Sequence, residues 1–119
     1  MEEQNNTERI PYGLAVHGIE EEKAVLDVIK NHKTIMGQKV KQFESSIAQI
    51  FGKQFGTMVN SGSSANLLSV FAAGNPLRKK RLKINDEVLI PVLCWSTSLW
   101  PLVQFGLKPK FVDIDLKTL

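Results

Sequence analysis

The stretch Asn60–Asn66, which reads Asn-Ser-Gly-Ser-Ser-Ala-Asn, combines residue types that can bind an anion. A short apolar segment precedes it and a helical pattern closed by Gly74 follows it, so Gly62, Ser63 and Ser64 are predicted at a strand-to-helix turn. The first N–H groups of a helix lack intrahelical partners and carry a partial positive charge. These three residues therefore predict a phosphate cradle. Each charge-assisted hydrogen bond there would contribute about 1.5–3 kcal/mol.

A second explanation of the same stretch requires no ligand. Serines at a helix start are ordinary N-cap residues, because their side chains accept hydrogen bonds from the first helical N–H groups. The stretch also matches neither well-known phosphate motif, since no lysine follows the glycine as in a Walker loop and the spacing differs from GxGxxG. The motif alone leaves both explanations open.

Alternating helices and strands must position this turn. Their order, two helices followed by strand, helix, strand, helix and strand, predicts an α/β fold with a parallel sheet covered by helices. Ligands bind such sheets at the carboxyl ends of the strands, where residues 60–64, 91–95 and 113–115 are expected. The expected helices are residues 20–30, 39–51, 66–73 and 95–105, and the expected strands are residues 55–60, 87–91 and 110–115.

Trp95, directly after the second expected strand, is a candidate for stacking on a planar ring, which would contribute about 0.5–1.5 kcal/mol beyond burial. The alternative is a core tryptophan, and Trp100 is expected in the core or at an interface. Cys94 is expected to be a packed thiol, because no paired base is visible. No metal site is expected, since His17 and His32 lack ligand spacing.

Composition narrows the class of protein. The 119 residues contain 15 Lys and Arg against 12 Asp and Glu, a mild net charge of +3 that does not favour nucleic acid. The basic run at residues 78–83 is expected to be solvated surface, and residues 1–9 a polar N-terminal arm. A single cysteine, no apolar run of about 20 residues and no secretory signal indicate a cytoplasmic protein that does not span a membrane.

Four segments occur in the order and spacing of one family: the stretch Asn60–Leu68, the strand Asp86–Pro91, the tripeptide Trp95-Ser-Thr97 and the segment Gly106–Asp115. Together they resemble the N-terminal part of the DegT-type sugar aminotransferases, which have the aspartate aminotransferase fold, fold type I of the pyridoxal 5'-phosphate (PLP) enzymes. The resemblance extends from about Ile10 to the end and also includes Thr34-Ile-Met-Gly37. Within the family, the sequence of these segments resembles most the branch of nucleotide-sugar 3-dehydratases.

This resemblance implies that Gly62, Ser63 and Ser64 hold the PLP phosphate and that Trp95 stacks on the pyridine ring. Members of the family act on nucleotide-linked 4-keto-6-deoxy sugars by aminotransfer, with glutamate as the amino donor, or by C3 dehydration, for surface polysaccharides or deoxysugars. They are homodimers. In the dehydratase branch a His replaces the Schiff-base Lys.

The chain is much shorter than members of this family, so residues 10–119 are expected to form only the N-terminal part of the PLP-binding large domain. The catalytic Lys or His would lie beyond residue 119, so no catalytic residue is assigned and the chain alone is expected to be inactive. The alternative function is a non-catalytic phosphate- or nucleotide-binding α/β module, and an interaction protein that uses the basic run at residues 78–83 is a third hypothesis.

Overall fold

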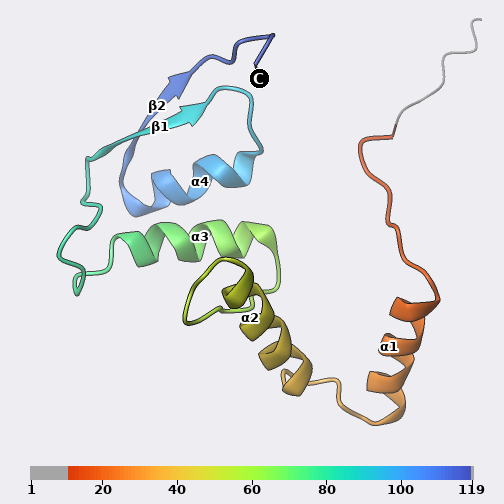
Figure 1. The fold of residues 1–119 in the computed structure, drawn as a ribbon. Helices are drawn as coiled ribbons and strands as arrows, with labels where there is room; N and C mark the ends of the chain where they lie inside the picture. The colour runs from red at the N-terminus through yellow and green to blue at the C-terminus, as the bar shows by residue number, and fades with distance from the viewer. Residues whose placement is uncertain (1–10, 119) are drawn as a thin grey trace, which may run out of the picture. The chain divides into compact units, whose positions relative to one another are not determined.

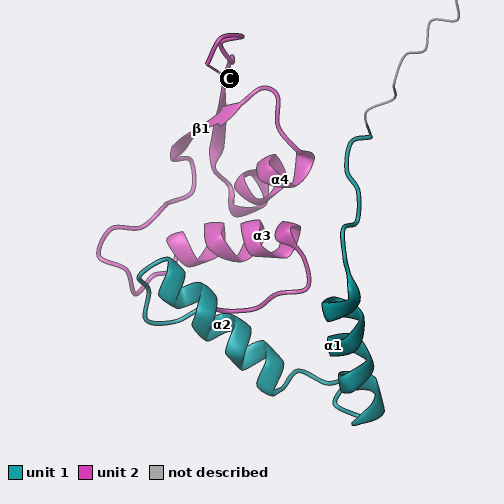
Figure 2. Cartoon of the chain, turned by 45° about the vertical axis from the view of Figure 1, so that its right-hand side comes forward, with its two compact units in different colours: residues 1–56 teal, residues 57–119 magenta. Residues whose placement is uncertain are grey.

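The computed structural model describes residues 11–118, which form two compact units that divide after Gly56 (Figure 2). The expected arm at residues 1–9 lies outside the described residues. In the part of the chain from residue 11 to 118, no helix is long and apolar enough to cross a membrane.

The first unit contains two helices, α1 (Ile19–Lys30) and α2 (Gln38–Ile50), each beginning one residue before its expected start. At the start of α1 the Gly18 N–H donates to a carboxylate oxygen of Glu21 at 2.7 Å. This hydrogen bond lowers the pKa of Glu21, because it favours the charged carboxylate. Ala48 is the buried apolar residue of this unit.

The second unit contains α3 (Gly62–Ala73), β1 (Glu87–Pro91), α4 (Ser96–Phe105) and β2 (Lys108–Val112). The two strands pair in parallel, in a register that runs from Glu87 opposite Lys108 to Pro91 opposite Val112. Ile90, Leu102 and Leu107 form the buried cluster of this unit, and half-buried side chains from α3, α4, β1 and the loop before β1 pack around it. The α/β character expected from the sequence is therefore present.

Helices α3 and α4 run in the same direction and opposite to the strands (Figure 1). At their C-terminal ends Phe71 and Phe105 meet edge to face, with ring centroids 5.3 Å apart. A Cβ atom at Gly74 would overlap the Phe105 ring, so this close approach requires glycine. Because the helices run opposite to the strands, both helices begin on the side of this unit where the carboxyl ends of β1 and β2 lie. Ligands of parallel α/β folds bind on that side.

Three of the expected elements differ from the structure by more than one residue. Residues 55–60 form no strand, because an apolar pattern alone makes no ladder and no other segment among residues 11–118 pairs with it. Helix α3 begins at Gly62 rather than Asn66, so the expected turn is the first turn of the helix. Strand β2 covers Lys108–Val112 rather than residues 110–115, because its pairing with β1 begins at Lys108 and ends at Val112.

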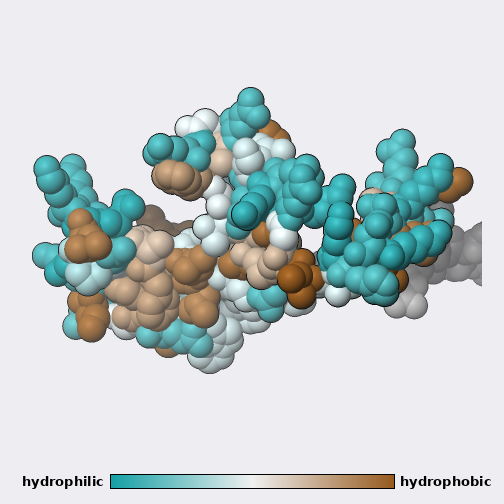
Figure 3. All heavy atoms as spheres, turned by 90° about the horizontal axis from the view of Figure 1, so that it is seen from below, coloured by the Kyte–Doolittle hydropathy of each residue, from teal (hydrophilic) through white to brown (hydrophobic). Residues whose placement is uncertain are grey.

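Much of the apolar surface remains uncovered in both units (Figure 3). Only five residues are buried among the described residues: Ala48, Ile90, Pro101, Leu102 and Leu107. Large exposed side chains include Ile35, Phe55, Leu77, Leu89 and Leu93. Exposed apolar surface of this extent drives association, and the two-stranded sheet offers unpaired edges.

Residues 1–119 expressed alone should therefore aggregate or remain partly unfolded. The measurement is light scattering combined with thermal unfolding followed by circular dichroism. A monomer with one sharp unfolding transition would contradict this prediction.

Candidate functional site

Ser61 caps the helix that carries the phosphate cradle. Its Oγ accepts a hydrogen bond from the Ser64 N–H at 3.1 Å, and its carbonyl accepts one from the Ala65 N–H at 3.0 Å. The Ser64 hydroxyl in turn donates to Oδ1 of Asn60 at 2.7 Å. Ser61, which was not among the predicted site residues, therefore caps the helix, and the Ser64 side chain holds the turn through Asn60.

Capping by Ser61 leaves the donors of Gly62 and Ser63 available. Neither their N–H groups nor the Ser63 hydroxyl has a hydrogen-bond partner among residues 11–118. Ser63 is exposed, and both residues lie in the first turn of α3, where the helix dipole is positive. Two N–H groups and one hydroxyl form a donor set that suits phosphate oxygens.

The cradle borders a pocket of about 210 Å³ between α3 and α4. Helix α4 contributes residues at spacings of three, four and seven, which place them on one face. This face of α4 was not predicted as part of a site, although its i, i+3, i+4, i+7 spacing is visible in the sequence. The lining residues are Ser63, Ser64, Leu67, Thr97, Trp100, Pro101 and Gln104.

Trp95 lies directly before α4, in an extended backbone conformation, and its side chain is 63% exposed. It is therefore not a core residue of the described part of the chain, and it does not line the pocket next to the cradle. Trp100, expected in the core or at an interface, is 57% exposed and lines that pocket.

Cys94, Asp113 and Asp115 follow the carboxyl ends of β1 and β2 in the chain. Cys94 is exposed, so the expectation of a packed thiol is wrong for the described residues. Asp113 and Asp115 follow β2 instead of lying on it. Asp115 Oδ1 accepts hydrogen bonds from the N–H groups of Lys117 and Thr118 at 2.8 and 3.2 Å, so this side chain holds the turn that follows β2.

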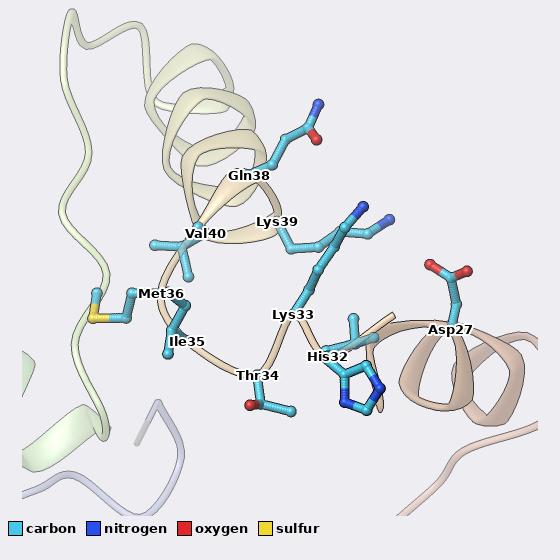
Figure 4. Close-up of a pocket in the computed structure, with 11 residues that line it drawn as sticks. Asp27, His32, Lys33, Thr34, Ile35, Met36, Gln38, Lys39 and Val40 are labelled. Carbon is cyan, nitrogen blue, oxygen red and sulfur yellow. The ribbon is translucent and has the colours of Figure 1, made fainter. Parts of the chain in front are cut away.

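A larger hollow, of about 520 Å³, lies within the first unit at the connection between α1 and α2 (Figure 4). In Figure 4 the Lys33 and Lys39 side chains extend to the same side of this connection, and the His32 ring lies apart from them. Thr34-Ile-Met-Gly37, part of the family resemblance, forms its wall. No group of three or more His, Cys, Asp or Glu residues in the described part of the chain could hold a metal ion.

A profile of the DegT/DnrJ/EryC1/StrS aminotransferase family matches residues 16–119, most of the chain. The chain belongs to this family. A curated relative, the GDP-4-keto-6-deoxy-D-mannose 3-dehydratase of Escherichia coli O55:H7 (strain CB9615 / EPEC), is 48% identical over 99 residues. The match covers 83% of this chain and 25% of the relative, so the chain spans about a quarter of that relative's length.

Solved structures of family members agree with this assignment. The chain is similar to the E. coli GDP-4-keto-6-deoxy-D-mannose-3-dehydratase with bound hydrated PLP, with a TM-score of 0.81 and 43% identity over 93% of this chain and 28% of that one. A GDP-4-keto-6-deoxymannose-3-dehydratase with a trapped PLP-glutamate geminal diamine gives a TM-score of 0.79 and 42% identity, over 90% and 28%. This likeness confirms the expected fold class, part of a fold type I PLP enzyme.

Proposed function

We propose that this chain is the N-terminal part of the PLP-binding large domain of a nucleotide-sugar 3-dehydratase. The enzyme would remove the C3 hydroxyl of a nucleotide-linked 4-keto-6-deoxy sugar, with glutamate as the amino donor. The observation that carries the proposal is the similarity, in sequence and in fold, to a 3-dehydratase whose structure contains PLP. Glutamate is favoured because a similar structure contains a PLP-glutamate adduct.

The donor set of the phosphate cradle fits this cofactor. The N–H groups of Gly62 and Ser63 and the hydroxyl of Ser63 would bind the PLP phosphate, while Ser64 holds the turn through Asn60. Trp95 would supply an aromatic face for the pyridine ring. Bound PLP would supply the electron sink that makes C–O cleavage next to a ketone accessible.

Aminotransfer at C4 of the same class of sugar is the second candidate, and the family description favours it. The two reactions differ in the residue that moves protons on the cofactor, Lys for aminotransfer and His for dehydration, and neither residue is assigned in this chain. We also propose a cytoplasmic homodimer for the full-length protein. The cytoplasm is proposed because an enzyme that uses nucleotide sugars works where these are made. The homodimer is proposed because a partner subunit would cover apolar side chains that are exposed in both units.

The test is an assay of the full-length protein with PLP, glutamate and GDP-4-keto-6-deoxymannose, in which NMR follows the sugar carbons. We expect C3 to lose its oxygen and become a methylene group, with no amino sugar formed. An amino group at C4 with C3 unchanged would identify an aminotransferase instead. A protein that binds no PLP and leaves the sugar unchanged would contradict the proposed function.

A further inference from the structure

A proline in α4 leaves one carbonyl group of that helix without its regular partner. Pro101 is the sixth residue of the helix and has no N–H, so it cannot donate to the Thr97 carbonyl one turn earlier. The amide Nδ2 of Asn66, which projects from α3, donates to this carbonyl at 3.3 Å. The hydrogen bond thus joins two helices across 31 positions of the sequence.

The two ends of this bond lie next to the two halves of the proposed cofactor site. Asn66 stands one helical turn after Gly62, on the helix that carries the cradle. Thr97 stands two residues after Trp95 and lines the pocket together with Ser63. A change in the Asn66–Thr97 bond would therefore shift the cradle relative to the segment that carries Trp95.

We propose that Asn66 is a positioning residue that fixes the distance between the phosphate cradle and Trp95. This inference rests on the proposed function, because only a ligand with a phosphate and a ring uses both parts at once. Joining two contacts in one rigid ligand strengthens binding only while their separation is held, as for any bivalent ligand. Asn66 would thus affect binding of the whole cofactor more than binding of either of its parts.

The experiment compares Asn66→Ala with wild type in the full-length protein, using PLP, pyridoxal and inorganic phosphate as separate ligands. Because one side-chain hydrogen bond contributes about 0.5–1.5 kcal/mol, we expect PLP affinity to fall roughly two- to tenfold. Affinities for pyridoxal and for phosphate should remain unchanged. Asn66 is exposed, so the variant should fold.

The matched control is Ser69→Ala, which removes an exposed side chain on α3 whose hydroxyl donates within the helix, to the Ala65 carbonyl at 2.8 Å. We expect this control to bind all three ligands as wild type does. An unchanged PLP affinity in Asn66→Ala would overturn the inference. A loss of affinity for inorganic phosphate as large as the loss for PLP would also overturn it. A wild-type protein that binds no PLP would instead overturn the proposed function.

A second pair of variants tests whether Asn66 positions the two helices or only supplies a hydrogen-bond donor to the Thr97 carbonyl. Pro101→Ala restores a main-chain N–H that can donate to this carbonyl. Asn66→Ala should therefore lower the melting temperature by less in the Pro101→Ala protein than in wild type. The roughly two- to tenfold loss of PLP affinity caused by Asn66→Ala should persist there, because an intrahelical bond does not join the two helices. Recovery of PLP affinity would overturn the positioning role.

Discussion

Ser63→Asp in the full-length protein should weaken PLP binding by about 30- to 1,000-fold. The new carboxylate would stand among the donors of the phosphate cradle and face the phosphate at a few ångströms. Two like charges about 4 Å apart near a protein surface repel by roughly 4 kcal/mol, and the exposure of Ser63 reduces this to about 2–4 kcal/mol. The measurement is a PLP titration followed by absorbance.

Two controls define the effect of Ser63→Asp. Ser63→Ala should weaken PLP binding less than Ser63→Asp does, by about one decade, because it removes one exposed hydroxyl and leaves the N–H groups of Gly62 and Ser63 in place. Ser69→Asp adds the same charge further along α3 and should change PLP affinity little, since Ser69 lies beyond the first turn. Superimposable titration curves for wild type and Ser63→Asp would show that the PLP phosphate does not bind at this helix start.

Trp95→Ala should weaken PLP binding by about one to two decades, whereas Trp95→Phe should retain most of the affinity. Stacking requires an aromatic face, and its loss together with the apolar contact corresponds to roughly 1–3 kcal/mol. PLP should also quench the fluorescence of Trp95 in the wild-type protein. Titration and thermal unfolding are measured on the same three proteins.

The alternative, a structural tryptophan, makes a different prediction for the same variants. Truncating a buried tryptophan destabilises a protein by roughly 3–5 kcal/mol, and cofactor affinity of the folded fraction would not change. The 63% exposure of Trp95 argues against this alternative within the described residues. A large loss of melting temperature with intact PLP affinity would nevertheless assign Trp95 to the core of the full-length protein.

Local signals in the sequence were sufficient for most elements of the fold. Strand β1 has the expected bounds, and α4 ends where expected because Gly106 adopts a left-handed conformation with φ of 87°. The expected strand at residues 55–60 failed for a physical reason, since a strand exists only through hydrogen bonds to a partner. The sequence pattern carries no information on whether that partner is present.

The site was predictable where its chemistry is local. Glycine and serines at a helix start indicated the cradle, but not that Ser61 would cap the helix and leave Ser63 available. The Asn66–Thr97 hydrogen bond was not predictable, because it depends on how two helices pack. Pro101 lies inside α4, and its missing N–H leaves the Thr97 carbonyl free to accept this hydrogen bond.

The central claim is that the start of α3 binds the phosphate of PLP, and the ratio of PLP to pyridoxal affinity in the wild-type full-length protein tests it most directly. The two ligands differ only in the phosphate group. Two charge-assisted hydrogen bonds at about 1.5–3 kcal/mol each predict that PLP binds roughly two to four decades more tightly than pyridoxal. Ser63→Asp should abolish most of this preference. Equal affinities of the wild-type protein for PLP and pyridoxal would contradict the claim.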